Sequence, residues 1–288
     1  ALPIGISFYT FESMSYIIDV YRGRVQVVNR FLDYAHFVTM FPRLVAGPIV
    51  RYAEIVDQLK VQQPRLDSVT AAQAIYFFVM GLAKKVLIAD PIARTLVDPQ
   101  FSQGGGGLIA AWAGALGYTA QLYFDFSGYS DMAVGLGLLV GFRLPRNFNL
   151  PYRAISIADF WRRWHISLST WLRDYLYISL GGNRKGTTRT YINLFLTMLL
   201  GGLWHGANWT FVLWGAWHGC ALLVGHISAG HRRLPHLIER AITLLVVVFG
   251  WVMFRAETLA QAVAREQLKL ERPSGSNVRS RQSFHDPI

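Results

Sequence analysis

The sequence predicts an all-α protein, a polytopic transmembrane helix bundle, and three observations support this. Of the 288 residues, 52% are hydrophobic and only 16% are charged, whereas a soluble domain carries about a quarter charged residues. The hydrophobic residues gather in long continuous runs. Basic residues gather between those runs, and each predicted element follows from one of these patterns.

Several apolar runs are candidates for membrane spans, since a helix needs about 20 mostly apolar residues to cross a bilayer. The stronger runs are 69–89, 107–141, 190–203, 207–229 and 237–254, and the weaker ones are 1–20 and 34–50. Run 237–254 is long enough on its own. Run 107–141 fits a tilted span, a broken span or two short segments. Run 190–203 is short enough to be a half-helix or a re-entrant piece.

A re-entrant segment is predicted at 41–52, "FPRLVAGPIVRY", where Pro42, Gly47 and Pro48 interrupt an apolar run. Irregular backbone at membrane depth is tolerated only where protein or water covers its polar groups. We therefore expect this segment to enter the bundle without forming a regular span.

The segment 143–189 is strongly basic and is predicted to face the cytoplasm. Only Asp159 and Asp174 oppose its basic residues, which are Arg143, Arg146, Arg153, Arg162, Arg163, Arg173, Arg184, Lys185 and Arg189. Such an excess between spans is typical of cytoplasmic loops and suits contact with anionic headgroups. The net charge of +11 could indicate nucleic acid binding, but its placement favours the membrane. No nucleic acid partner is therefore expected.

Within that segment the sequence predicts an amphipathic helix at 159–176. Apolar residues recur at spacings of three and four, which marks one face of a helix. They are Phe160, Trp161, Trp164, Leu168, Trp171, Leu172, Tyr175 and Leu176. We expect the helix to lie in the membrane interface or across the mouth of the bundle, and to end at "GGN", 181–183. On this stretch alone, His165 is interpreted as a polar residue at the lipid boundary.

Asp125 and Asp131 lie within an apolar run, where ionisable side chains usually face the bundle interior or a wet cavity. They are six residues apart, so on one helix they point about 120° apart, and Gly128 could break that helix. Two interpretations are open: a proton or cation pathway, or the favoured structural role, with hydrogen bonds from backbone or hydroxyl groups. Lys84 and Lys85 are interpreted as a span terminus with snorkelling side chains.

The stretch 201–219, "GGLWHGANWTFVLWGAWHG", places two histidines among apolar and tryptophan residues. On an unbroken helix, His205 and His218 would point roughly 140° apart and lie about 20 Å apart along the axis, so they could not bind one metal. Glycines beside His205 let another chain approach, and its imidazole could remove a proton from a hydroxyl. An ordinary role at a helix end is the alternative. Cys220 is expected to be a buried packing residue, and no cysteine pattern indicates structural zinc.

The two ends of the chain predict a protein that is incomplete at both termini. The opening "ALPIGISFYT" has neither an initiator methionine nor the pattern of a signal peptide. Residues 263–288 are polar and without apolar periodicity, so we expect them to be disordered. The predicted division is a transmembrane core at 1–262 and a tail at 263–288.

Five motifs, read together, resemble one family. They are "PIGISFYTFESMSYIIDVYRG", "FPRLVAGPIVRY", "FDFSGYSDMAVGLGLLVGFRLPRNFNLPYRA", "DFWRRWHISLSTWLRDYLYISLGGNR" and "GGLWHGANWTFVLWGAWHG". In this order, over about residues 1–262, they resemble the membrane-bound O-acyltransferase family, in its branch of bacterial alginate O-acetyltransferases. The resemblance implies a helix bundle around a central tunnel. His205 matches the family's near-invariant histidine, and His165 matches a second motif histidine.

The resemblance also implies a reaction, in which a cytoplasmic acyl thioester, acetyl-coenzyme A or an acyl carrier protein, acylates an acceptor hydroxyl or thiol. His205 would be the general base, and His165 would orient a substrate or stabilise the oxyanion. No metal or bound cofactor is expected, because a thioester is already activated. Substrate contacts are expected from Trp161, Arg162, Trp204, Asn208 and Asp125.

A cellular role follows from the same resemblance. It implies a multi-pass protein of the bacterial inner membrane that passes an acyl group, expected to be acetyl, to periplasmic partner proteins. Those partners would complete O-acetylation of a secreted polysaccharide such as alginate. Three alternatives stay open: D-alanyl or other acyl transfer to a cell-envelope polymer, a proton-coupled transporter, and a non-enzymatic scaffold of an export complex. His218 is assigned to packing or tunnel lining.

Overall fold

The computed structural model of the chain describes residues 5–43, 47–59, 66–103, 107–228 and 234–258. These ranges contain helices, turns and irregular connections and no strand, which confirms the all-α prediction. The α-helices are α1 Ile6–Tyr21, α2 Phe31–Thr39, α3 Tyr52–Leu59, α4 Ser68–Ala83, α5 Asp90–Ile92, α6 Asp98–Gln103, α7 Gly107–Leu139, α8 Ile157–Arg163, α9 Ile166–Trp171, α10 Thr187–His205, α11 Trp209–Ser228 and α12 His236–Arg255. Short 3-10 turns lie at Phe41–Arg43 and Pro151–Arg153, and π-helical turns lie at Lys84–Ala89, Ala93–Val97 and Leu172–Tyr177.

Three helical stretches are long and apolar enough to cross a membrane: Ser68–Ser102, Trp209–Ser228 and His236–Arg255. They match the predicted runs 69–89, 207–229 and 237–254. The first continues beyond its predicted end because π-helical turns join α4 to α5 and α6 without an interruption. These three stretches are the spans that sequence and structure indicate together.

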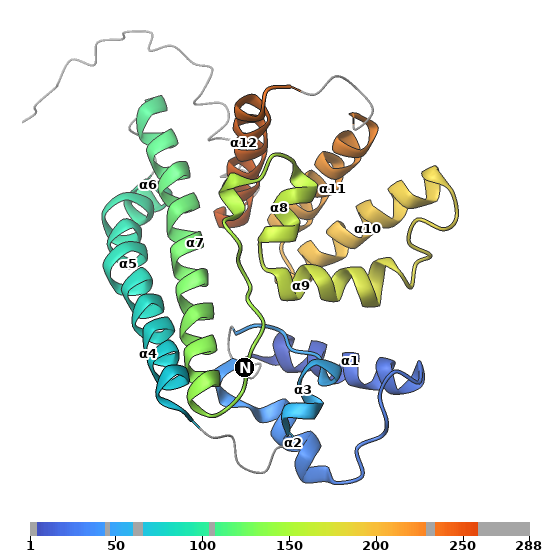
Figure 1. The fold of residues 1–288 in the computed structure, drawn as a ribbon. Coiled ribbons are helices and arrows are strands. Elements are labelled where there is room, and N and C mark those ends of the chain that lie inside the picture. Colours follow the sequence, from blue (N-terminus) through green and yellow to red (C-terminus); the bar gives the residue numbers. More distant parts are fainter. Residues whose placement is uncertain (1–4, 44–46, 60–65, 104–106, 229–233, 259–288) are drawn as a thin grey trace, which may run out of the picture.

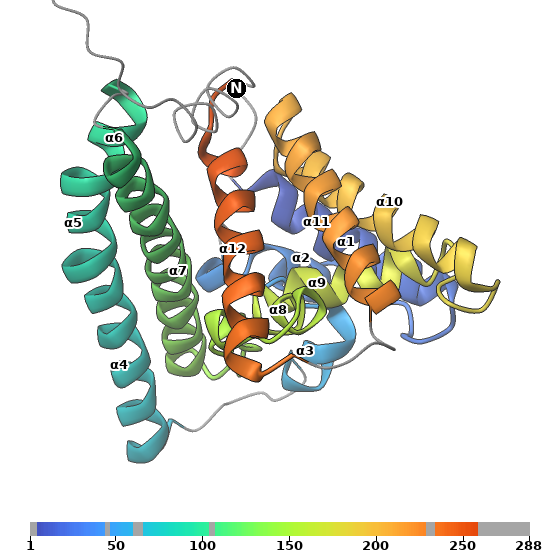
Figure 2. The same cartoon turned by 90° about the horizontal axis from the view of Figure 1, so that it is seen from above.

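The helix α7 is continuous over 33 residues, which excludes the possible break at Gly128 and the division of run 107–141 into two segments. Gly128 lies against α4, where a Cβ atom would come within 2.7 Å of the Gly81 carbonyl oxygen and 3.1 Å of Lys84 Cβ. Small residues at such positions let two helix backbones approach closely. Figures 1 and 2 show α4 and α7 side by side. The glycine therefore serves the packing of two helices and leaves α7 unbroken.

The two lysines that follow α4 form ion pairs with α7, so the predicted snorkelling is wrong. Lys84 Nζ lies 2.5 Å from Asp131 Oδ2, and Lys85 Nζ lies 2.7 Å from Asp125 Oδ1. Lys85 also lies 2.8 Å from Asp90. The carboxylates are thus paired with lysines, not with the backbone and hydroxyl donors predicted. The helical path continues past Lys85, which keeps both lysines at the α4–α7 interface.

The helices α10 and α11 form an antiparallel hairpin that reverses after His205, at Gly206 (Figure 2). α10 has 19 residues, which is longer than the predicted run 190–203. A Cβ atom on Gly202 would lie 3.1 Å from Gly215 Cα, and one on Gly215 would lie 2.6 Å from the Met198 carbonyl oxygen. The two backbones are therefore in close contact, and only glycine fits at either position.

The single amphipathic helix predicted at 159–176 is wrong, because the chain breaks at Trp164 and His165. Trp164 is extended, and His165 has a left-handed backbone with φ 42°. After the break, the Ile166 N–H donates to the Asn147 carbonyl oxygen at 2.9 Å. Asn147 Oδ1 also accepts a hydrogen bond from the Ser167 hydroxyl at 2.6 Å. The segment before α8 therefore fixes the break by binding the start of α9.

The apolar face of α8 and α9 packs inside the protein, not against lipid. Its residues join two clusters of buried side chains, one shared with α11 and α12 and one shared with α1. The most buried members are Phe160, Trp164, Leu168 and Trp171, each at most 5% exposed. The predicted position in the membrane interface is therefore wrong for this face. Arg162 and Arg173 are exposed on the other side.

The N-terminal helices pack around a buried ion pair. The Arg43 guanidinium contacts the Glu12 carboxylate and donates to the Phe37 carbonyl oxygen. The Val50 N–H donates to the same carboxylate at 3.3 Å. The weaker run 34–50 does not form one helix, because α2 ends at Thr39 and irregular backbone follows the turn at 41–43. This agrees with the predicted interruption; residues 44–46 lie outside the described ranges.

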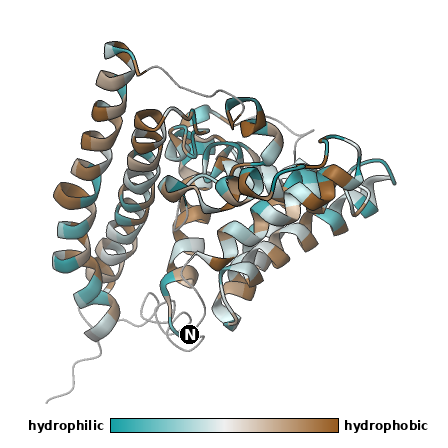
Figure 3. Cartoon of the chain, turned by 90° about the horizontal axis from the view of Figure 1, so that it is seen from below, coloured by the Kyte–Doolittle hydropathy of each residue, from teal (hydrophilic) through white to brown (hydrophobic). Residues whose placement is uncertain are grey.

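Large apolar side chains are exposed on the outer helices, as expected of surfaces that face lipid. Figure 3 shows hydrophobic residues along these helices, with hydrophilic ones among them. On α4 the exposed side chains include Val69, Ile75, Tyr76, Val79, Met80 and Leu82. Cys220 is also exposed, so its predicted burial is wrong. It adjoins Gly219, which faces Phe195 of α10. The predicted tail 263–288 lies outside the described residues.

Candidate active site

Two helix interruptions position the motif histidines. His165 stands at the break between α8 and α9, and His205 is the last residue of α10, directly before Gly206. Both lie outside the three candidate spans. A break moves the side chains at and after it out of the 3.6-residue register. His165 therefore does not occupy the face that an unbroken helix would give it, and the residues after Gly206 are reoriented relative to His205.

His165 is buried, with 3% of its surface exposed, where the sequence indicated the lipid boundary. Its ring centroid lies 4.6 Å from that of Phe126 on α7, with the planes 82° apart. Its Nε2 atom has no hydrogen-bond partner among the described residues. Burial, and to a smaller extent the charge of His205, lower the pKa of His165 to about 3. The two imidazoles are thus close enough to interact electrostatically.

His205 is enclosed by aromatic rings from three elements. Its centroid lies 4.8 Å from Trp204, 5.1 Å from Trp214 on α11 and 5.0 Å from Phe254 on α12. Burial lowers the pKa of His205 to about 4. The imidazole is therefore neutral near pH 7 and keeps the lone pair that a general base requires.

His218 lies on α11, the same helix as Trp214, and contacts the indole that His205 of α10 also contacts. Its centroid lies 5.0 Å from Trp214, and it is 0% exposed. The predicted separation of about 20 Å along one axis assumed an unbroken helix. The reversal at Gly206 overturns that assumption and places His205 and His218 against one shared ring. Among the described residues, no group of three or more metal-ligating side chains is present.

Trp161 and Trp204 also lie in this region. The Trp161 ring is 5.7 Å from Trp214 and 5.2 Å from His218. The Trp204 ring is stacked on Phe11 of α1 at 5.2 Å. The structure therefore brings these two predicted substrate contacts together with the histidines.

Asn208 stands in the hairpin turn, with both ends of its amide bonded to backbone. Its Oδ1 accepts from the Thr210 N–H at 3.1 Å, and its Nδ2 donates to the Glu257 carbonyl oxygen at 3.0 Å. This side chain caps the start of α11 and ties it to the residues after α12. These two hydrogen bonds stabilise the turn between α10 and α11.

Arg162 and Asp125 are not brought to the histidines. The Arg162 side chain is 71% exposed and lies 3.6 Å from Asp159. Asp125 faces Lys85 of the α4 side, while its neighbour Phe126 faces His165. The two residues thus lie outside the aromatic enclosure of His205.

Three residues of the site were missed by sequence reasoning: Trp214, Phe254 and Gly250. The last lies against His218, whose Nε2 would be 2.5 Å from a Cβ atom at position 250. Tryptophan, phenylalanine and glycine in apolar runs are ordinary membrane residues, so no local signal marked them. The Gly206–Asn208 turn was the available signal, because asparagine before a helix is a preferred N-terminal cap.

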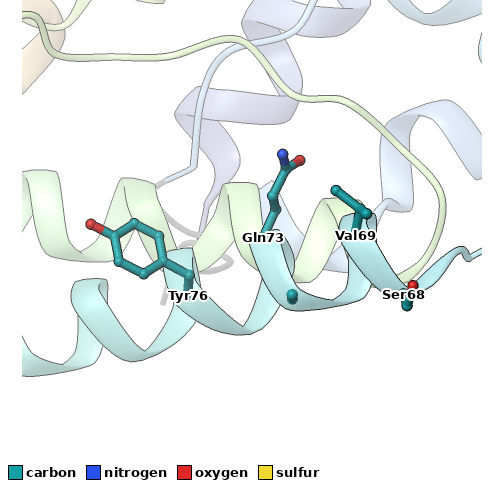
Figure 4. A pocket seen from close by; sticks show the side chains of 5 residues that line it. Ser68, Val69, Gln73 and Tyr76 are labelled. Atoms are coloured by element: carbon teal, nitrogen blue, oxygen red, sulfur yellow. The ribbon is translucent and has the colours of Figure 1, made fainter.

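A separate hollow of about 450 Å³ lies on α4 and is not part of this site. It is open and is lined by Ser68, Val69, Ala72, Gln73 and Tyr76 (Figure 4). Asp67 caps the same helix, since its carboxylate accepts from the Thr70 N–H at 2.6 Å. None of the predicted catalytic residues lines this hollow.

Comparison with known proteins identifies similar chains. The model of a family described as "MBOAT, membrane-bound O-acyltransferase family" matches residues 6–260. A "Probable alginate O-acetylase AlgI" of Pseudomonas aeruginosa is 58% identical over 264 residues, which cover 91% of this chain and 50% of that protein. A "Peptidoglycan O-acetyltransferase" of Helicobacter pylori is 43% identical over 293 residues, covering 91% of this chain and 55% of that protein.

A less similar relative is named for a different polymer. The "Teichoic acid D-alanyltransferase" of Bacillus subtilis is 28% identical over 265 residues, covering 87% of this chain and 67% of that protein. The chain spans about half the length of the Pseudomonas and Helicobacter relatives. The matched half contains both motif histidines and their aromatic surroundings.

Proposed function

Since this chain belongs to the membrane-bound O-acyltransferase family, we propose that it moves an acetyl group from a cytoplasmic thioester toward O-acetylation of a secreted polysaccharide such as alginate. The observation that carries the proposal is the neutral His205 imidazole, enclosed by Trp204, Trp214 and Phe254 and electrostatically coupled to His165. A partly buried site with a neutral proton acceptor suits acyl transfer from an activated thioester.

In the proposed reaction His205 takes the proton of the acceptor hydroxyl as its oxygen attacks the thioester carbonyl carbon. The C–O bond forms, and the carbonyl oxygen becomes an oxyanion. The C–S bond then breaks, and the thiolate receives the proton from the His205 imidazolium. His165 orients a substrate or contributes to oxyanion stabilisation. General-base catalysis typically contributes about 10²–10⁴-fold to such a step.

The donor is proposed to be acetyl-coenzyme A or an acyl carrier protein, both of which carry negative charge. An exposed basic surface between α7 and α10 supports this, because it would attract an anionic donor. Its residues are Arg143, Arg146, Arg153, Arg162, Arg173, Arg184, Lys185 and Arg189. We place this surface on the cytoplasmic side by the positive-inside rule.

We further propose that the protein lies in a bacterial inner membrane and delivers the acetyl group to periplasmic partners that complete polysaccharide acetylation. A tunnel through the bundle, with substrate contacts from Trp161, Trp204 and Asn208, belongs to the same proposal. D-alanyl transfer to an envelope polymer is the second candidate. The 28% identity to a teichoic acid D-alanyltransferase supports it, and the 58% identity to an alginate O-acetylase favours acetyl.

The test uses a chimaera, because the chain spans about half of its relatives. Residues 6–260 replace the matching region of the Pseudomonas aeruginosa protein, in an alginate-producing strain that lacks its own copy. His205→Ala is compared with His226→Ala, which changes an exposed histidine of α11. Membrane abundance, the O-acetyl content of secreted alginate and the mass of the ester are measured.

We expect the chimaera and its His226→Ala form to acetylate alginate, and the His205→Ala form to be present in the membrane without ester formation. Full acetylation in the His205→Ala form would refute the catalytic role. Esters with the mass of D-alanyl groups would replace the acetyl proposal with the second candidate. An abundant chimaera that forms no ester would favour a scaffold.

A further inference from the structure

Three rings beside His205 form a closed group: Trp161 of α8, and Trp214 and His218 of α11. Their centroids lie 5.7 Å apart for Trp161 and Trp214, 5.2 Å for Trp161 and His218, and 5.0 Å for Trp214 and His218. The ring planes meet at 78°, 81° and 65°. Each ring therefore contacts both of the others, and we refer to the three as the ring cluster.

Every ring nitrogen of this cluster is buried and unpaired. Among the described residues, neither Trp161 Nε1, Trp214 Nε1 nor either nitrogen of His218 has a hydrogen-bond partner. Trp214 is 3% exposed and His218 is 0% exposed. Buried polar atoms are nearly always hydrogen-bonded, so each exception needs an explanation. Four of the fifteen unpartnered side-chain atoms among the described residues lie on these three rings.

The chemistry of these atoms specifies what would satisfy them. An indole nitrogen is only a donor, and a neutral imidazole offers one donor and one acceptor. The ring cluster therefore presents three N–H donors and one lone pair. Its matching ligand is rich in acceptor lone pairs, as the oxygen of a carbonyl group is. A cation does not fit, because the cluster has one lone pair and no carboxylate.

The position of the cluster connects it to the proposed reaction. Trp214 is in contact with His205 as well as His218, and its plane is 88° from that of His205. The ring that carries one of the unpaired donors, Trp214 Nε1, is thus in contact with the proposed general base. A carbonyl oxygen held by the cluster would place its carbon toward His205 and the acceptor hydroxyl.

We propose that the ring cluster binds the carbonyl oxygen of the acyl thioester and stabilises the oxyanion that forms on it. This proposal rests on the proposed function. As the acceptor oxygen attacks, the carbonyl π electrons move to the oxygen, and the N–H groups of Trp161, Trp214 and His218 stabilise that charge. When the C–S bond breaks, the electrons return to restore the carbonyl group, and His205 delivers the proton to the thiolate. No further reactant is needed.

The test removes the indole N–H donors and keeps an aromatic ring at each position, using Trp161→Phe and Trp214→Phe in the chimaera described above, in membranes of the alginate-producing strain that also contain the partner proteins. Trp209→Phe is the matched control, because Trp209 lies on the same helix as Trp214 and is 70% exposed. Acetyl transfer from acetyl-coenzyme A to alginate oligosaccharides gives kcat and KM. Loss of one oxyanion donor typically lowers kcat by about 10²–10³-fold. We expect that loss in both cluster variants, with KM nearly unchanged, and none in the control.

A second measurement does not depend on any variant folding. Binding of acetonyl-coenzyme A, a ketone that keeps the carbonyl oxygen, is compared with binding of propyl-coenzyme A, a thioether without it. We expect the wild-type chain to bind the ketone more tightly and the cluster variants to bind the two equally. The ketone preference reports hydrogen bonding to the carbonyl, which loss of packing alone would not remove selectively.

Two results would overturn the proposal while leaving the proposed function intact: equal binding of both analogues by a wild type that transfers acetyl, or unchanged kcat in both cluster variants. The first would mean that the cluster holds water or packs without a ligand. A chimaera without these substitutions that transfers no acetyl group from acetyl-coenzyme A in the same membranes would overturn the proposed function with this donor. The two failures are therefore distinguishable.

Discussion

His218 on α11 and Gly250 on α12 fit against each other without room for a side chain at position 250. A Cβ atom built on Gly250 would lie 2.5 Å from His218 Nε2 and 3.3 Å from its Cε1. The imidazole is also flanked by Trp161 and Trp214. The glycine of α12 therefore lets the two helices approach closely enough for the imidazole to pack against the α12 backbone.

A methyl group at this position would test that fit. We expect Gly250→Ala to destabilise the protein by about 1–3 kcal/mol, because added atoms in a packed core force neighbours off their positions. Thermal unfolding in detergent measures the change. The matched control is Gly225→Ala on α11, where a Cβ atom would meet nothing within 4 Å. Equal unfolding temperatures for both variants would contradict the close fit.

The ion pair between Lys84 and Asp131 should stabilise the α4–α7 interface. Its side chains are 24% and 27% exposed, and removing one partner leaves the other charge in a partly dry interface. A double-mutant cycle with Lys84→Ala and Asp131→Ala should give a coupling energy of about 0.5–3 kcal/mol. The exposed pair of Arg162 and Asp159 is the control, expected at about 0–1 kcal/mol. Additive effects at Lys84 and Asp131 would show that the pair contributes nothing.

The pH profile of the reaction should report the burial of His205. A base works only when deprotonated, and burial lowers the pKa of His205 to about 4. The neutral, active form therefore persists as the pH falls below 6.5, the ordinary range of histidine. We expect kcat/KM for acetyl transfer to change little between pH 7 and about pH 5 and to fall below that. A decline centred near pH 6.5 would mean that the catalytic base is solvated.

Substitutions at His165 should separate its backbone role from its imidazole. Asparagine tolerates the left-handed conformation, whereas a β-branched residue is strained there. With φ 42° at this position, we expect His165→Asn to keep membrane abundance and unfolding temperature. His165→Val should lose about 1–3 kcal/mol of stability.

Leu150 provides the control, because its backbone is also left-handed with φ 47° and its side chain is 52% exposed. Leu150→Gly should therefore stabilise the chain, by up to about 1 kcal/mol, through relief of strain. If His165→Val unfolds at the same temperature as the wild type, the break between α8 and α9 does not depend on this conformation.

Spans with uniform hydrophobicity were predictable from the sequence, as 207–229 and 237–254 illustrate. The break at His165 was not, because the apolar spacing of three and four continues through it without a change. That break depends on hydrogen bonds from Ile166 and Ser167 to Asn147, some twenty residues earlier. The local spacing of apolar residues does not depend on such a distant hydrogen-bond partner, so it could not indicate the break. The same limit explains why lysine partners for Asp125 and Asp131 were not foreseen.

Within the candidate site, the histidines carried recognisable motifs and their aromatic neighbours did not. Trp214 and His218 both lie on α11. The reversal of the chain at Gly206 brings His205 of α10 against the Trp214 indole, which His218 also contacts. Treating 201–219 as one helix separated His205 from His218 and concealed that contact. A reading that gave more weight to Asn208 as the cap of a new helix would have recovered it.

The hairpin of α10 and α11 determines when this region can assemble during synthesis. Closing a turn of a few residues costs little chain entropy, and contacts of short sequence separation form fastest. His205 can therefore meet Trp214 as soon as α11 has left the ribosome, before α12 has emerged from it. When α12 arrives, it adds Phe254 and Gly250 to a pair of helices that is already formed. The aromatic neighbours of His205 are therefore added in the order of translation, Trp214 first and Phe254 later.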